Sequence, residues 1–261
     1  MPKCAPLNER YKRVFALCAL LLITLVVAVN AKAGDFAFIT TTDYSTGSSS
    51  VIWMNKQYDV DKDVASIYSD AVSRYYNGLI YVINRYGADN IQVLDPENGF
   101  VTLRQFSVGN GSDLHDISFF DDTKAYVTRY NTNELWVVNP QSGSHTGTID
   151  LSQFADGDGI CEMDKMLARA GNAFVSIQKL DRNNWWLPTG PGVIVIIDMS
   201  ADTLIDLDPS KDGIQGIELP YGNPYSDIEF DPYSGKLFIS CVGTWGVNDG
   251  GVVTIDPDSL T

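Results

Sequence analysis

The sequence predicts an all-β domain made of about five consecutive repeats, each built from four short antiparallel strands. Three observations support this. Short strands centred on Tyr or Phe recur along the chain, Tyr81 and Tyr126 lie 45 residues apart, and no segment after residue 33 shows the 3.6-residue period of an amphipathic helix. The Tyr/Phe strands lie at residues 36–40, 79–84, 124–129, 172–176 and 236–240.

The elements around each Tyr/Phe strand complete the repeat. A polar loop and a β-rich strand follow, and the strand ends in a turn such as Asp/Asn-Pro-x-x-Gly at 95–99 and 139–143. Proline presets φ in such a turn and glycine supplies a positive φ. One further strand precedes the Tyr/Phe strand, as at 116–119 and 227–230, and another follows the turn, as at 146–150. Four short strands in about 45 residues are typical of a β-propeller blade.

Two of these strands also carry a family resemblance. Tyr-Val-Ile-Asn at 81–84 and Tyr-Val-Thr-Arg at 126–129, each placed before an Asp/Asn-Pro turn, resemble the YVTN-type β-propeller repeat of exported bacterial and archaeal proteins. The resemblance covers residues 36–261, with Phe174 and Phe238 in place of the tyrosine. It implies a surface or periplasmic protein and leaves the chemistry open.

The repeats also predict how many blades the chain contains. The repeats give a partial first unit, three complete units and a last unit that stops after its third strand. Because a closed ring usually needs six to eight blades, we expect residues 34–261 to be a β-propeller domain that is incomplete at its C-terminal end. A five-bladed ring is the alternative.

The first 33 residues are predicted to be a secretory signal peptide. Lys3, Arg10, Lys12 and Arg13 precede an apolar run at 14–29, and Ala31-Lys32-Ala33 gives an A-x-A cleavage site. The apolar run is short for a spanning helix, which needs about 20 residues. We therefore expect an exported protein, periplasmic, secreted or on the cell surface, with no membrane span after cleavage. An uncleaved anchor is the alternative.

Charge narrows the classes of partner. The chain has a net charge of −15, and without the first 33 residues, which hold five Lys/Arg and one Glu, the net charge is −19. A nucleic-acid binder needs Lys and Arg to replace phosphate counterions, so this balance argues against one. Divalent cations and cationic partners fit it better. Cys161 and Cys241 remain after cleavage, and either a disulfide or two buried thiols fits their positions.

The long loops give a candidate binding surface. In a four-stranded blade, the loop between the second and third strands lies on the same face as the loop into the next blade. The long insertions at 179–191 and 242–251 are of the first kind, so we expect them to be neighbours. They carry Trp185, Trp186 and Trp245, which either pack the insertions onto the propeller or form a ligand platform. The ligand would be a protein, a glycan or a small molecule.

Arginine and tyrosine recur at the end of two successive second strands. Arg85, Arg129 and Tyr130 are therefore candidate ligand-binding residues on the same rim. A pair of arginines there would grip a carboxylate or a sugar. The alternative is that each arginine binds a neighbouring Asp and fixes its loop.

Metal and catalytic motifs are few. Asp156, Asp158 and Glu162 offer closely spaced oxygens and form a candidate calcium site, whose alternative is a solvated acidic turn. No catalytic residue is assigned. Only two histidines are present, no serine lies in a G-x-S-x-G elbow, and no glycine-rich phosphate loop occurs. Asp116, with equivalents at Asp227 and Asp164, is expected to make a hydrogen bond between blades.

These observations favour a binding or interaction module over an enzyme. The leading hypothesis is an exported β-propeller that binds through its long-loop face. One alternative is a calcium-dependent lactonase or esterase of the gluconolactonase-like propeller type, which requires side chains converging on one metal. The other alternative is a structural surface-layer component, for which self-assembly is the discriminating property.

Overall fold

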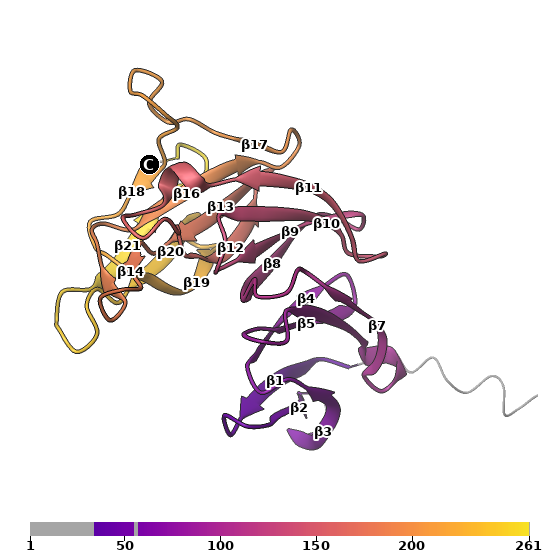
Figure 1. Ribbon diagram of the computed structural model, residues 1–261. Helices are drawn as coiled ribbons and strands as arrows, with labels where there is room; N and C mark the ends of the chain where they lie inside the picture. The colour runs from indigo at the N-terminus through magenta and orange to yellow at the C-terminus, as the bar shows by residue number, and fades with distance from the viewer. Residues whose placement is uncertain (1–33, 55–56, 261) are drawn as a thin grey trace, which may run out of the picture.

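The computed structural model describes residues 34–54 and 57–260, and the predicted signal peptide lies outside them. The chain forms five small antiparallel sheets in a ring, the arrangement of a five-bladed β-propeller (Figure 1). The fold class predicted from the repeats is therefore confirmed, and the five sheets correspond to the five repeats. A ring of six to eight blades stays a prediction.

The first two sheets come from the N-terminal part of the chain. The first has three strands and the second has four, hydrogen-bonded in chain order. The strands are β1 (Phe36–Thr42), β2 (Gly47–Trp53) and β3 (Asp59–Ile67), then β4 (Ala71–Tyr76), β5 (Leu79–Asn84), β6 (Asn90–Asp95) and β7 (Val101–Ser107).

The remaining three sheets follow in the same order. The third sheet is β8 (Leu114–Asp121), β9 (Lys124–Arg129), β10 (Glu134–Asn139) and β11 (Ser144–Asp150). The fourth is β12 (Met163–Arg169), β13 (Asn172–Ile177), β16 (Val193–Asp198), β17 (Thr203–Leu204) and β18 (Ile217–Glu218). The fifth is β19 (Pro224–Asp231), β20 (Lys236–Cys241) and β21 (Gly251–Ile255), and β14 (Leu180–Asp181) pairs with β15 (Leu187–Pro188) in a separate hairpin.

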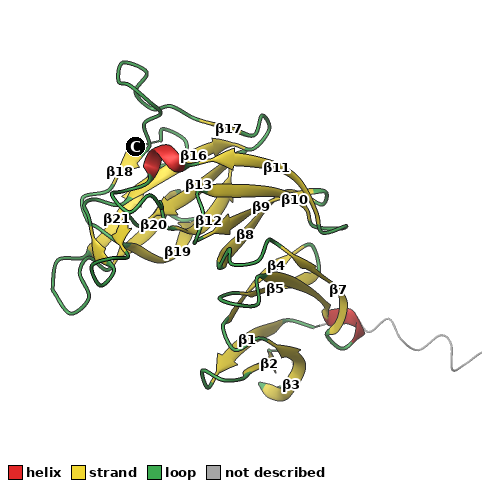
Figure 2. Cartoon of the chain, in the orientation of Figure 1, coloured by secondary structure: helices red, strands yellow, loops and turns green. Residues whose placement is uncertain are grey.

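Loops and turns make up nearly all of the rest of the described chain (Figure 2). The described helical segments are two short 3₁₀ turns, η1 (Pro96–Asn98) and η2 (Ser152–Phe154). Asp95 caps η1 by accepting a hydrogen bond from the Glu97 N–H at 3.0 Å. Gly99 ends it with a φ of 65°, as the Asp-Pro-x-x-Gly pattern predicts. Among the described residues no helix has the length and apolar character needed to cross a membrane.

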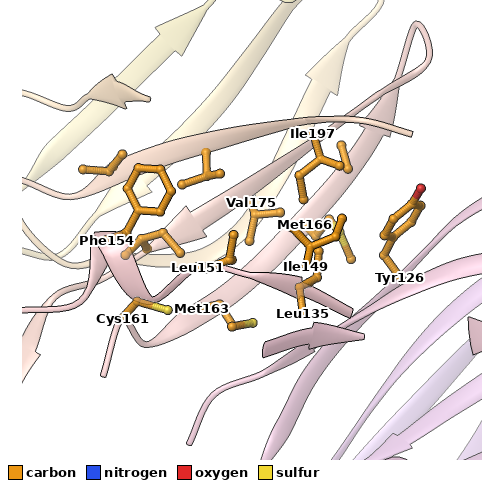
Figure 3. Close-up of a cluster of buried hydrophobic side chains, with 14 of the residues drawn as sticks. Tyr126, Leu135, Ile149, Leu151, Phe154, Cys161, Met163, Met166, Val175 and Ile197 are labelled. Carbon is orange, nitrogen blue, oxygen red and sulfur yellow. The ribbon is translucent and has the colours of Figure 1, made fainter. Parts of the chain in front are cut away.

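The hydrophobic core lies between neighbouring sheets. Successive side chains of a strand point to opposite faces, so in β5 Tyr81 and Ile83 pack against the third sheet while Ile80 and Val82 pack against the first. The near-continuous apolar sequence of these central strands is explained by this burial on both faces. The cluster between the third and fourth sheets includes Tyr126, Leu135 and Met163 (Figure 3).

Buried polar groups join the sheets. The Tyr126 hydroxyl, at the end of a fully buried ring, donates a hydrogen bond to the Met199 carbonyl at 2.9 Å and also contacts the Asp202 carboxylate. Asp116 on β8 accepts a hydrogen bond from the Met166 N–H on β12 at 2.9 Å, which confirms the predicted link between blades. Arg74 on β4 binds Asp116 at 2.7 Å and Asp227 on β19 at 2.6 Å.

The two cysteines of the domain belong to different parts of the core. Cys161 is buried between the third and fourth sheets, and Cys241 is buried between the fourth and fifth. Both are free. Of the two possibilities that the sequence left open, the structure has two buried thiols.

Candidate ligand-binding face

The long loops lie on one face of the ring, because antiparallel strands place alternate connections at opposite ends. We call this the loop face. It carries the connections between second and third strands and those that enter the next sheet, at residues 43–46, 68–70, 85–89, 108–113, 130–133, 151–162, 178–192, 219–223 and 242–250. The Asp/Asn-Pro turns lie on the opposite face, the turn face.

Loop 219–223 lies between the two insertions and is hydrogen-bonded to both of them. The Gly192 N–H donates to the Tyr221 carbonyl at 3.0 Å, and the Gly243 N–H donates to the Gly222 carbonyl at 3.1 Å. Loop 219–223 is therefore bonded to both insertions. The expectation that they share one region of the loop face is confirmed.

Arg182 anchors the first insertion to the rim. Its Nε donates to Glu162 Oε1 at 2.7 Å, and its Nη1 and Nη2 donate to Asn131 Oδ1 and the Tyr130 carbonyl, both at 2.8 Å. The Arg182 N–H also donates to Asp158 Oδ2 at 2.9 Å. Three loops of the loop face thus converge on one arginine, and hydrogen bonds to charged groups are stronger than neutral ones.

The tip of this insertion presents two tryptophans in a strained backbone. Trp185 and Trp186 have φ values of 58° and 59°, in the left-handed region. Each such residue costs about 1–2 kcal/mol relative to the right-handed region. The Trp185 residue is 90% exposed. Trp186 stacks on Tyr130 with ring centroids 6.1 Å apart and has the Arg182 guanidinium 4.9 Å from its ring.

Trp245 belongs to a second, separate aromatic pair. It packs edge-on against Tyr225, with ring centroids 5.5 Å apart, and is 63% exposed. The three predicted tryptophans therefore share the loop face but form two groups, one on each insertion. Packing accounts for Trp186, whereas Trp185 is almost free of the protein surface.

Beneath Trp186 lies a buried polar chain that the sequence did not predict. The Tyr130 hydroxyl donates to Gln178 Oε1 at 2.7 Å, and Gln178 Nε2 donates to Asp164 Oδ2 at 2.9 Å. Asp164 Oδ1 lies 2.7 Å from His115 Nδ1, and the His115 ring stacks on Tyr130 at 4.1 Å. Burial works against the charged imidazole, but Asp113 and Asp164 outweigh it and raise the pKa of His115.

The two predicted arginines hold their own loops. Arg85 binds Asp70 Oδ1, with its Nη2 at 2.5 Å and its Nε at 3.0 Å. Arg129 is buried, donates to Glu134 Oε2 at 2.9 Å and stacks on Trp136 at 4.1 Å. For this pair the geometry agrees with the structural alternative, in which each arginine fixes a loop.

The three predicted calcium ligands bind protein donors instead of converging. Glu162 Oε2 accepts from the Leu180 N–H at 3.0 Å and Oε1 from Arg182, while Asp156 Oδ2 accepts from the Thr189 hydroxyl at 2.8 Å. Burial raises the pKa of Glu162 to about 7, although Leu180 and Arg182 oppose it. Within residues 34–54 and 57–260, no group of three or more His, Cys, Asp or Glu side chains is arranged to hold a metal ion.

A polar residue directly before the innermost strand recurs in four sheets, and the sequence reasoning missed it. Its carbonyl accepts the N–H of the residue just after the second strand, at 2.8 to 3.2 Å. The pairs are Asp70 with Arg85, Asp113 with Tyr130, Glu162 with Gln178 and Asn223 with Val242. Aligning the repeats on the Tyr/Phe strands and counting back to the preceding strand start would have found it. We call these four residues the entry residues.

Comparisons with known proteins agree with the fold. No family model and no curated protein matches the chain, so the resemblance to YVTN-type repeats stays a prediction. Among solved structures, Kuenenia stuttgartiensis hydrazine synthase is similar with a TM-score of 0.57 at 13% identity. The match covers 89% of this chain and 66% of that one, so the chain spans just under two thirds of that protein's length. Dihydro-heme d1 dehydrogenase NirN in complex with DHE matches at a TM-score of 0.41 and 14% identity, over 72% of this chain and 38% of that one. At such identities the likeness to hydrazine synthase shows the fold alone.

Proposed function

We propose that this chain is an exported β-propeller that binds a ligand through its loop face. The observation that carries the proposal is Trp185, which is 90% exposed and held in a strained backbone conformation. The basic, apolar and A-x-A segments at the N-terminus support export.

The geometry of the insertion supports a binding role over simple packing. An exposed tryptophan gains nothing from the protein core, and a positive φ at a bulky residue lowers stability. Such strain persists only where the surroundings hold it, and here Arg182 supplies four hydrogen bonds to do so. A rigid loop also lowers the entropy lost on binding, because the side chains are already in place.

The chemistry of the loop face limits the ligand. Trp185 and Trp245 offer aromatic surface, and Asp156, Asp158 and Asp181 lie on the first insertion or beside it. Aromatic rings flanked by acceptors suit a glycan, a peptide or a small organic ligand. The net charge of −15 disfavours a nucleic acid.

The test begins with finding ligands. The purified protein is applied to arrays of immobilised glycans and peptides, and every ligand that binds is titrated against the wild type and the Trp185→Ala/Trp186→Ala/Trp245→Ala variant. We expect a loss of at least roughly tenfold in affinity, since large aromatic contacts dominate binding energies. If the variant binds all of these ligands as tightly as the wild type, the proposal fails.

A further inference from the structure

His115 lies between two carboxylates in the interior of the loop face. Its Nδ1 is 2.7 Å from Asp164 Oδ1 on β12, and its Nε2 is 3.7 Å from Oδ1 of Asp113, the entry residue of the third sheet. The side chains of His115, Asp164 and Asp113 are 12%, 1% and 14% exposed, so water solvates them little. Asp113 Oδ1 is buried and accepts no hydrogen bond from the described residues. The protonation state of the ring therefore decides how the two acids are stabilised.

A neutral His115 ring satisfies one of the two carboxylates. The neutral ring has one N–H and one lone pair, whereas the imidazolium has an N–H at each nitrogen. Asp164 Oδ1 is at hydrogen-bond distance from Nδ1 and accepts the single N–H of the neutral ring. Nε2 then turns its lone pair toward Asp113 Oδ1, and the two electron pairs repel each other. The imidazolium instead turns an N–H toward both acids.

The other charged groups around the ring do not replace this second donor. Lys165 Nζ on β12 donates to the His115 carbonyl at 3.1 Å and is 3.9 Å from Asp164 Oδ1, so its charge supports Asp164. Asp89 accepts the Asp113 N–H at 2.7 Å and adds a negative charge beside Asp113. Loss of the His115 proton therefore leaves Asp113 next to a second acid and without its cationic partner.

These contacts set the sign of the pH dependence. Burial opposes the charged ring, but Asp113 and Asp164 outweigh burial and raise the pKa of His115 above its ordinary value of 6.5. Stabilisation by the imidazolium is therefore complete below about pH 6.5 and is lost as the pH rises through the folded-state pKa. Glu162, which binds Arg182 at 2.7 Å, is a second source of pH dependence, because burial raises its pKa to about 7.

Tyr130 connects His115 to the first insertion. The His115 and Tyr130 rings stack with centroids 4.1 Å apart, and the Tyr130 N–H donates to the Asp113 carbonyl at 3.0 Å. The Tyr130 hydroxyl donates to Gln178 Oε1 at 2.7 Å, and its carbonyl accepts Arg182 Nη2 at 2.8 Å. Asp113 has a φ of 48°, in the left-handed region, so the surrounding contacts must hold it there. A change at Asp113 therefore reaches the first insertion through Tyr130.

We propose that His115 is a pH-sensitive switch that controls the rigidity of the loop face. The imidazolium attracts both Asp113 and Asp164, and so keeps loop 108–113 and the first insertion ordered. When the proton leaves, Asp113 loses its partner, loop 108–113 opens more often, and the contacts of Tyr130 loosen. The consequence that ligand affinity falls as the pH rises rests on the proposed function. The switch itself does not.

The first measurement is an NMR titration of the tag-free protein, which follows the ring Cε1–H resonances of its two histidines. His145→Gln assigns the two signals and is the matched control, because the His145 Nε2 contacts the Gly147 carbonyl and the Thr148 hydroxyl instead of a carboxylate. We expect the pKa of His115 to lie above 6.5 in the wild type and to fall in Asp113→Asn. A His115 pKa at or below 6.5, or one that Asp113→Asn leaves unchanged, would overturn the proposal.

The second measurement is hydrogen exchange of the amides at 108–113 and 178–192, corrected for intrinsic rates, at about pH 5.5 and about pH 9. The opening equilibrium of loop 108–113 should rise roughly tenfold between these pH values, the size expected when one hydrogen bond to a charged group is lost. His145→Gln and Glu162→Gln should keep this rise, and His115→Gln should abolish it. A wild type without the rise, or a His115→Gln protein that keeps it, contradicts the switch.

Neither measurement needs a ligand. Failure of the switch would therefore leave the proposed function standing, and failure of ligand binding would leave the switch standing. If His115→Gln does not fold, the wild-type titration and the response of the His115 pKa to Asp113→Asn still decide the outcome.

Discussion

Replacing Arg74 by Met is expected to destabilise the whole ring, because this side chain ties three innermost strands together. Its Nε and Nη2 donate to Asp116 on β8 at 2.7 and 2.8 Å, and its Nη2 donates to Asp227 on β19 at 2.6 Å. Asp227 is 153 residues away in sequence. Methionine keeps much of the apolar stem of the side chain and removes the charge and the donors.

The expected loss of unfolding free energy follows from the carboxylates that Arg74→Met leaves without their cation. Removing one partner of a buried ion pair costs about 3–5 kcal/mol. The Asp116 side chain is fully buried, but it keeps the hydrogen bonds from the Ile117 and Met166 N–H groups. The Arg74 side chain is 28% exposed, so water screens part of its charge. We therefore expect the low end, about 3 kcal/mol, or roughly 6–12 °C in unfolding temperature for a domain of this size.

The assay is chemical and thermal unfolding followed by circular dichroism. The matched control is Lys62→Met, which removes the same charge from an exposed position on β3. The double variant Arg74→Met/Asp116→Asn measures coupling, and its loss should be smaller than the sum of the two single losses. If the unfolding free energy of Arg74→Met lies within about 0.5 kcal/mol of that of the Lys62→Met control, the stabilising role given to the ion pairs of Arg74 with Asp116 and Asp227 is refuted.

Three further predictions concern single side chains. Burial raises the pKa of Glu162 to about 7 from 4.5, so the folded state holds its proton more tightly and the unfolding free energy should fall as the pH rises through that window. In urea titrations at several pH values, the unfolding free energy of Glu162→Gln should depend less on pH than that of the wild type. An unchanged pH dependence would contradict the role given to Glu162. Tyr126→Phe should cost about 1 kcal/mol because the hydrogen bond from the Tyr126 hydroxyl to the Met199 carbonyl is lost while Lys124 Nζ still donates to that carbonyl, and a neutral result in the same titration would count against it. Arg182→Met should speed proteolysis within 182–190, and an unchanged cleavage rate would mean that other contacts hold the insertion.

Much of the fold could be predicted because each blade repeats the same local rules. Tyr81 and Tyr126 mark second strands that are apolar on both faces, and a strand buried on both sides has few alternative positions. The turn at Asp95 follows from proline and glycine geometry that needs no tertiary contact. Phe174 stands where two of the other repeats have tyrosine, and the strand still forms, because the buried aromatic ring that both residue types share holds the strand in place.

The candidate site was predicted only in outline, because its decisive contacts join residues far apart in sequence. The acidic run that ends at Glu162 suggested a cation, but Arg182 folds back through the β14–β15 hairpin and occupies that carboxylate. An extra residue in β8 also defeated the repeat alignment. The register of β8 shifts between Phe119 and Asp121, and the corresponding end of β12 has no such shift. Lys165, and not Asp164, is therefore level with Asp116, so the predicted equivalence of Asp164 is wrong, and that residue binds His115 instead. Spacing alone does not reveal either event.

The measurement that tests the central claim most directly is oxidative footprinting of the protein with and without an array-identified ligand. The loop face carries Trp185 and Trp245, and the turn face carries Tyr233, which is 98% exposed and serves as an internal reference. The account predicts that bound ligand slows oxidation of Trp185 or Trp245 while Tyr233 reacts at its free rate. Protection of Tyr233 with both tryptophans unprotected would place binding on the turn face and contradict the account.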